Sequence, residues 1–192
     1  MSVTSEKINL DGVRLSFPHL YQAKSFTKGQ DPKFQATFLL DPSDKAHAKA
    51  IKEIKAESKR IVIEAFGEKP KGLKRCYGLA KDHDKKKDYE GYEGMFYIAT
   101  SNTTRPVLVD RKRKPVDEAD GILYAGVYVN TVITLWCQDH EVGGKGVNAN
   151  LRIVQFMKPG EAFGNAPAKA DEELTDVDDD DGDADDDWDD DD

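Results

Sequence analysis

The sequence has few cysteines, no long apolar run and no secretory signal, and each absence excludes a class of protein. Only Cys76 and Cys137 occur, which is too few for a disulfide framework and typical of reduced thiols in a cytosolic chain. No apolar run approaches the roughly 18 residues that cross a membrane, so we expect no membrane partner. The start, Met1-Ser-Val-Thr-Ser5, lacks the basic and apolar segments of a secretory signal.

Catalytic and metal-binding constellations are equally scarce. The chain has no glycine-rich phosphate loop, no nucleophile elbow and no histidine with an evident partner. Asp82-His83-Asp84 and Asp117-Glu118-Ala119-Asp120 could hold Mg²⁺ as in a nuclease, but both lie among lysines, where solvated charge is the ordinary role. Cys137 and His140 are too few for zinc, which takes about four ligands. We therefore predict no enzyme, no metal and no cofactor.

Charge is abundant and unevenly divided along the chain. The whole sequence carries 28 Lys+Arg and 37 Asp+Glu, for a net charge of −9. Residues 171–192 hold sixteen acidic and no basic side chains, so we expect a disordered, solvated acidic tail. Residues 1–170 keep all 28 basic and only 21 acidic groups, a net charge of +7. A basic domain over 1–170 joined to a polyanion suggests that the domain binds another polyanion.

The apolar periodicity of residues 1–170 predicts six strands. The first covers residues 8–17, with a bulge at Asp11-Gly12 and an end at Pro18. The others are 34–40, 95–101, 107–110, 123–138 and 147–157. Residues 18–32 and 69–94 are predicted to be polar loops, the second unusually long. Both faces of residues 123–138 are largely apolar, which suits a long, bent strand in a closed barrel.

One long helix is predicted between the second and third of these strands. Asp41-Pro42-Ser43-Asp44 indicates its start, with an N-cap acid followed by proline at the first helical position. The helix should cover about residues 43–66, because Ile51, Ile54 and Ile61 recur at helical spacing. Six strands and one helix favour a mainly β fold, an oligonucleotide/oligosaccharide-binding (OB) type of antiparallel β-barrel with five to six strands.

Basic and aromatic residues are interleaved along the polar segments, which suits single-stranded nucleic acid. Such binding needs cations that follow the phosphates and aromatic rings on which bases stack, at roughly 1–3 kcal/mol each. The candidate stacking residues lie in predicted loops beside charge: Tyr21, Phe26, Tyr77, Tyr89 and Tyr92. The candidate phosphate contacts are Lys24, Lys28, Lys33, Lys74, Arg75, Lys85, Lys86, Lys87, Arg105, Arg111, Lys112, Arg113 and Lys114.

Two further expectations refine this set. The four consecutive cations from Arg111 to Lys114 repel one another unless an anion is near, so this loop is the favoured phosphate contact. The aromatic residues of the predicted strands are expected in the core instead; they are Phe34, Phe38, Phe96, Trp136 and Phe156.

Five segments of the chain resemble one phage protein family. They are residues 12–20 (GVRLSFPHL), 34–41 (FQATFLLD), 94–102 (GMFYIATSN), 124–130 (YAGVYVN) and 146–156 (GVNANLRIVQF). The family is the single-stranded DNA-binding proteins of tailed bacteriophages, once catalogued as a domain of unknown function, and the resemblance covers about residues 8–164. It implies an OB fold, sequence-tolerant binding of single-stranded DNA, and work in phage DNA replication, recombination and repair in the cytoplasm of the infected bacterial host. The helix after two strands instead of three, and the long segment 69–94, depart from a standard OB barrel.

The acidic tail fits the same resemblance, because phage and bacterial single-strand binders often end in an acidic tail with a hydrophobic residue near its tip. The tip residues are predicted to compete with DNA and to recruit replication or recombination proteins; they are Asp185, Asp186, Asp187, Trp188 and Asp189. A flexible chain of this length spans on the order of 25 Å. Tethering gives an effective concentration in the millimolar range, so a weak attraction suffices.

Two alternatives remain open from the sequence. A recombination mediator or annealing protein would use the same groove and add strand pairing. An acidic-tailed interaction scaffold would bind no nucleic acid, which the net charge of +7 over residues 1–170 argues against. An exposed edge of the long strand 123–138 could support a homodimer, but no residue pattern demonstrates one.

Overall fold

The computed structural model describes residues 3–25, 29–141 and 143–164. The strands are β1 (Ile8–Lys24), β2 (Lys33–Leu40), β3 (Lys74–Arg75), β4 (Tyr77–Leu79), β5 (Phe96–Asn102), β6 (Val107–Val109), β7 (Tyr128–His140) and β8 (Gly144–Lys158). The helix is α1 (Lys45–Phe66), and short 3₁₀ helices cover Ala80–Asp82, Lys86–Asp88 and Glu118–Asp120. No helix in these ranges is long and apolar enough to cross a membrane.

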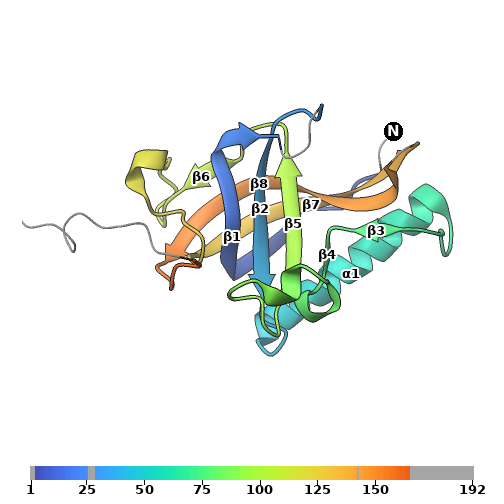
Figure 1. Ribbon diagram of the computed structural model, residues 1–192, viewed down its shortest axis with the longest axis horizontal. Coiled ribbons are helices and arrows are strands. Elements are labelled where there is room, and N and C mark those ends of the chain that lie inside the picture. Colours follow the sequence, from blue (N-terminus) through green and yellow to red (C-terminus); the bar gives the residue numbers. More distant parts are fainter. Residues whose placement is uncertain (1–2, 26–28, 142, 165–192) are drawn as a thin grey trace, which may run out of the picture.

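Five of these strands close into a barrel. β1 pairs with β2 and β7, β2 pairs with β5, and β7 pairs with β8, all antiparallel. A parallel bridge between Ser101 of β5 and Asn150 of β8 completes the ring. Such a five-stranded barrel is the OB architecture, so the predicted fold class is confirmed (Figure 1). The predicted acidic tail, residues 171–192, lies outside the described residues.

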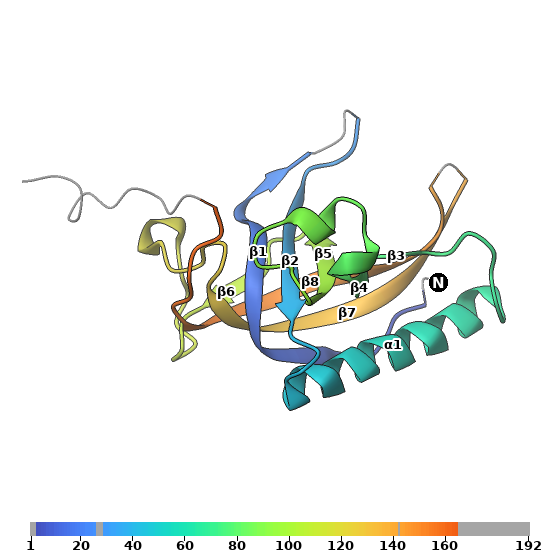
Figure 2. The same cartoon turned by 60° about the horizontal axis from the view of Figure 1, so that its bottom comes forward.

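One continuous core fills the barrel and extends under α1. Alternate residues of β7 point inward and are buried, among them Val129, Ile133 and Leu135. α1 packs on β1 and β7 and contributes Ile54 and Ile61, both fully buried (Figure 2). The core prediction for the strand aromatics is correct for Phe38 and Phe96, whereas three are only half-buried: Phe34, Trp136 and Phe156.

The prediction that Pro18 ends the first strand is wrong. β1 continues to Lys24, and its register with β2 shifts between Ser16 and His19. A bulge is where a strand tolerates proline, because the missing N–H is not needed by the ladder. The predicted bulge at Gly12 is confirmed by a shift between Leu10 and Val13.

The helix start also needs a correction. The N-cap is Asp44, whose carboxylate accepts from the backbone N–H groups of Ala46 and His47 at 2.8 and 2.9 Å. Asp41 instead accepts from the N–H and hydroxyl of Ser43, closing the turn before the helix. Two acids three residues apart both suit an N-cap, and the second one takes that position.

Residues 69–94 are not the long loop that their polarity predicts. β4 pairs with β5 and β3 with β8. Residues 80–94, here called the insert, fold over the outside of the barrel, where Ala80 and Tyr92 form a small second core with Leu39 of β2 and Tyr97 of β5. Gly91 has a φ of 77° and packs so closely on Phe163 that a Cβ there would collide with the ring. The backbone N–H of Gly164 donates to Glu90 at 2.6 Å, so the segment after β8 holds the insert in place.

Candidate nucleic-acid interface

OB barrels bind oligonucleotides on the outer face of their second and third strands, between the two flanking loops. Here those strands are β2 and β5. Their register places Gln35 opposite Ser101 and Thr37 opposite Ala99. These residues alternate with inward, buried Phe38 and its neighbours, so they form the outer side. We call this surface the β2–β5 face.

The insert covers one half of the β2–β5 face. Its Tyr92 packs against Leu39 and Tyr97 on the outer side of the two strands, and the Tyr92 hydroxyl lies 3.1 Å from the Ser16 hydroxyl of β1. Tyr92 is only 1% exposed, so no ring face is open to a base and its predicted stacking role is wrong. The polar sequence around Tyr92 gave no sign that tertiary packing would bury it.

An exposed aromatic pair lies where the insert meets β1. Phe17 and Tyr89 are 49% and 39% exposed, and their ring centroids are 5.1 Å apart in an edge-to-face arrangement. The Lys86 ammonium lies 5.9 Å from the Tyr89 centroid and 4.8 Å from that of Tyr97. Burial lowers the pKa of Lys86. The predicted residues Tyr89 and Lys86 thus share one cluster with Phe17.

Phe17 was not among the predicted site residues, but its unusual backbone conformation makes it a candidate. Its φ is +47°, a left-handed conformation that costs a non-glycine residue roughly 1–2 kcal/mol. Half of the side chain is in solvent, so packing does not repay that cost. Strained residues of this kind concentrate at functional sites. The sequence signal was limited to an aromatic residue beside Arg14 and before Pro18.

Cations gather at the β1–β2 hairpin, at one edge of the β2–β5 face. Lys24 and Lys33 are directly opposite each other in the register, and like charges so placed destabilise a strand pair unless an anion is near. Neither has an ion pair; among the described residues Arg60 is the only Lys or Arg that does. The predicted Phe26 and Lys28 lie outside the described residues.

Tyr21, near the end of β1, packs partly against the core. Its ring contacts the core, and its hydroxyl is buried without a hydrogen-bond partner in the described part of the chain. Burial, followed by the charge of Asp120, raises its pKa. Arg105 is exposed near it. Tyr21 therefore offers less open surface than its predicted stacking role requires.

At the opposite edge of the face, β3 carries two predicted phosphate contacts. The Lys74 ammonium donates to the Gly143 carbonyl at 3.1 Å, which places it beside the β7–β8 hairpin. Arg75 and Tyr77 line a cavity against α1 instead. The Tyr77 ring lies 5.7 Å from that of Phe96, and its packing on this side separates it from the β2–β5 face.

The favoured basic loop, Arg111 to Lys114, lies apart from the other candidates. Asp110 organises it as a turn by accepting from the N–H groups of Lys112 and Lys114 at 2.7 and 2.9 Å. All four cations are exposed. The turn follows β6, which lies on the far side of β1 from β2 and β5 in both views (Figures 1 and 2). The remaining predicted cations, Lys85 and Lys87, are exposed on the insert.

One of the two acidic clusters has a structural role in this fold. The N–H of Asp117 donates to the Asp120 carboxylate at 2.8 Å, part of a capping box on the 3₁₀ helix that follows. Within residues 3–25, 29–141 and 143–164, no three His, Cys, Asp or Glu side chains come together as a metal site. Neither cysteine forms a disulfide in the described part of the chain, and burial raises the pKa of Cys76 to about 12.

Comparison with known proteins gives consistent matches. A family model described as the single-stranded DNA-binding protein of Enterobacter phage Enc34 matches residues 6–186. Protein p50 of Acyrthosiphon pisum secondary endosymbiont phage 1 is 35% identical over 180 residues, covering 89% of this chain and 94% of that protein.

Solved structures agree with the sequence matches. The single-stranded DNA-binding protein from bacteriophage Enc34, in complex with single-stranded DNA, is 28% identical with a TM-score of 0.71, covering 82% of this chain and 89% of that one. The gp2.5 single-stranded DNA-binding protein of bacteriophage T7 is 14% identical with a TM-score of 0.53, covering 89% of this chain and 96% of that one. The second likeness concerns the fold alone.

Proposed function

Because this chain belongs to the family of phage single-stranded DNA-binding proteins represented by that of Enterobacter phage Enc34, we propose that it binds single-stranded DNA with little sequence preference. The observation that carries the site is the β2–β5 face. It is bordered at the hairpin by cations that have no ion pair among the described residues, and by an exposed, strained aromatic ring, Phe17. A solved structure of the similar protein from bacteriophage Enc34 is a complex with single-stranded DNA.

The two kinds of side chain do different work. Lys24 and Lys33 at one edge, and Lys74 at the other, contact phosphates and release counterions, a term that does not depend on sequence. Bases stack on Phe17 and Tyr89, which is possible only for unpaired bases because a duplex already stacks its own. Cations supply affinity, and the exposed rings supply the preference for single strands. The protein needs no catalytic group for this work.

The acidic tail adds control. Residues 171–192 compete with DNA for the basic domain, and DNA that neutralises enough cations displaces the tail for replication or recombination proteins. The setting is DNA replication, recombination and repair in the infected bacterial cell. Self-association stays a prediction, but the long strand expected to offer an exposed edge, β7, is paired with β1 on one side and β8 on the other.

Fluorescence anisotropy tests the proposal directly. A fluorescein-labelled oligo-dT of about 30 nucleotides and a matching duplex are titrated with the full chain and with residues 1–170, at low and moderate salt. We expect preferential binding of the single strand, with tighter binding by the truncated chain. Equal affinity for duplex and single strand would contradict the stacking contribution, and no binding to either would contradict the function.

A further inference from the structure

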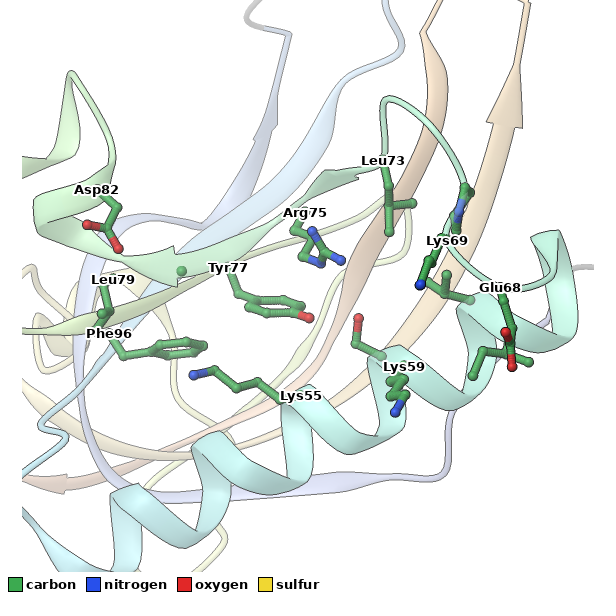
Figure 3. A pocket seen from close by; sticks show the side chains of 15 residues that line it. Lys55, Lys59, Glu68, Lys69, Leu73, Arg75, Tyr77, Leu79, Asp82 and Phe96 are labelled. Atoms are coloured by element: carbon green, nitrogen blue, oxygen red, sulfur yellow. The ribbon is translucent and has the colours of Figure 1, made fainter.

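A second cationic surface lies between α1 and the β3–β4 segment, away from the β2–β5 face. It is a cavity of about 730 Å³. One wall is the face of α1 that carries Lys55, Lys59 and Ile63, and the facing wall is formed by alternate residues of β3–β4, Arg75 and Tyr77 (Figure 3). We call this the α1–β4 cavity. Its size is within the roughly 300–1,000 Å³ of ligand sites.

The floor of the cavity is apolar and aromatic. The half-buried ring of Tyr77 lies 5.7 Å, centroid to centroid, from the ring of Phe96, which is only 1% exposed, beside Val62, Leu73 and Leu79. Tyr77 therefore supplies the aromatic surface that a ligand can contact. At the mouth of the cavity, the side chain of Ile63 is 42% exposed. A polar residue would be the ordinary choice at such an exposed position of a helix, so the apolar side chain extends the apolar surface of the cavity. A concave surface of this kind favours a flat apolar group.

The rim of the cavity carries an excess of positive charge. Lys55, Lys59, Lys69 and Arg75 line it, against Glu68 and Asp82. None of the four cations has an ion pair in the described part of the chain, where Arg60 holds both ion pairs. The Lys55 ammonium lies 5.6 Å from the centroid of Phe96, over the cavity floor. The combination favours a ligand with an aromatic group flanked by anions.

We propose that the α1–β4 cavity binds the tip of this protein's own acidic tail, with the Trp188 indole on the aromatic floor and the neighbouring aspartates at the cationic rim. Trp188 is the only aromatic residue in positions 165–192, and it is flanked by Asp187 and Asp189. The tail thus contains one group that matches the floor and many that match the rim.

The length of chain available permits the contact. Gly164, the last described residue, donates its backbone N–H to Glu90 of the insert. The 24 residues from there to Trp188 span at most about 80 Å when fully extended. A domain of this size is roughly 40 Å across. The tip can therefore reach the cavity of its own molecule without displacing any strand.

The position of the cavity links the docked tail to DNA. Arg75 lines both the α1–β4 cavity and a smaller neighbouring pocket that contains Lys74 and the β7–β8 hairpin. Aspartates next to a docked Trp188 would occupy Arg75 and approach Lys74 at the edge of the β2–β5 face. The proposed cavity gives a docking site to the acidic tail, and it rests on the proposed function in which the tail competes with DNA. Docking itself needs no DNA.

Tryptophan fluorescence of the full chain tests the docking without DNA. Trp136→Phe leaves Trp188 as the sole indole. We expect its emission to lie to the blue of a free peptide of residues 183–192, with less quenching by acrylamide. Lys59→Glu with Lys69→Glu should return both signals to those of the peptide. Emission equal to that of the free peptide in the Trp136→Phe protein would overturn the proposal.

A matched control and a dilution series complete the test. Lys49→Glu with Lys52→Glu makes the same charge change on exposed positions of α1 that do not line the cavity, and it should leave the emission blue-shifted. A shift lost equally in both pairs would overturn the site. If the emission is constant on dilution, the contact is intramolecular, as proposed. If the blue shift vanishes on dilution, the cavity binds the tail of a second copy, and the intramolecular proposal is overturned. The DNA titration is read separately, so either claim can fail alone.

Discussion

The β2–β5 face and the α1–β4 cavity both present cations that form no ion pair with any residue the structure describes, but the two surfaces differ in shape and in what surrounds the charge. On the face, Lys24 and Lys33 border an open, polar strand surface with aromatic rings at one side. In the cavity, Lys55 and Lys59 surround a concave apolar floor. The open surface suits an extended polyanion with many equivalent charges, and the cavity suits a short anionic segment with one aromatic anchor.

The difference teaches that net charge alone does not identify a ligand. The charge of +7 over residues 1–170 indicates a polyanion partner, and both DNA and the acidic tail satisfy that description. The two ligands are distinguished by the curvature of the surface that binds them and by the apolar area beneath its charges. The predictions below test the two surfaces separately.

The largest effect is expected from the hairpin cations. Lys24→Glu with Lys33→Glu should weaken oligo-dT binding by on the order of 100-fold at low salt, because two phosphate contacts become repulsive. The slope of log K against log salt concentration should become shallower by about 1.4, because each of the two lost phosphate contacts to a single strand contributes about 0.7 to that slope. Anisotropy titrations over a salt series measure both quantities.

The same variant should leave the emission of Trp188 unchanged, since neither lysine lines the cavity. Lys49→Glu with Lys52→Glu serves again as the control of equal charge. An equal loss of DNA affinity in that control would mean that overall charge, and not the hairpin, determines binding.

A smaller effect is expected from the exposed ring. Phe17→Gly should weaken oligo-dT binding by about tenfold, the low end of a stacking contribution of roughly 1–3 kcal/mol. Stability should not fall, because glycine adopts the positive φ of this position without strain. Val107→Ala, which trims an exposed apolar side chain away from the face, is the control. Unchanged affinity in Phe17→Gly would remove this ring from the interface.

A weaker effect is expected from the tail anchor. Trp188→Ala should tighten oligo-dT binding by about threefold, the factor expected for a tail that is docked roughly two-thirds of the time and so leaves about one third of the protein competent to bind DNA. The duplex control should change less. If Trp188→Ala weakens binding to oligo-dT, the tail assists DNA binding and the competition is wrong.

The smallest effect concerns pH. Burial, followed by the charge of Lys24, lowers the pKa of His19. The unfolded chain then binds more protons than the folded one below about pH 6.5, so stability falls as the solution is acidified. His19→Gln should lose less thermal stability than the parent between about pH 7.5 and 5.5. An identical loss in both proteins would assign the acid sensitivity to other groups. The cavity lining contains no histidine, so its docking should not share this dependence.

The sequence predicts the barrel well because apolar alternation has a period of two and survives in every barrel strand. Residues 34–40 and 95–101, for example, match β2 and β5 closely. It misses the continuation of β1 through Pro18, where a bulge removes the hydrogen bond that proline cannot make. It also misses β3 and β4, which are too short to show any period.

The candidate site is predicted less completely, because exposure depends on contacts distant in sequence. Lys24, Lys33 and Tyr89 lie beside the proposed β2–β5 interface, whereas Tyr92, three residues after Tyr89, is buried against Leu39 and Ser16. Phe17 was identified only through its left-handed backbone, which the sequence does not display.

Photocross-linking tests the central claim, single-strand binding on the β2–β5 face, most directly. A 5-iodouracil oligonucleotide is cross-linked to the full chain, and the attached residues are identified by mass spectrometry. The account predicts cross-links at Phe17 and Tyr89, with few on α1. Cross-links concentrated on α1 or on the turn from Arg111 to Lys114, with none at Phe17 or Tyr89, would contradict it.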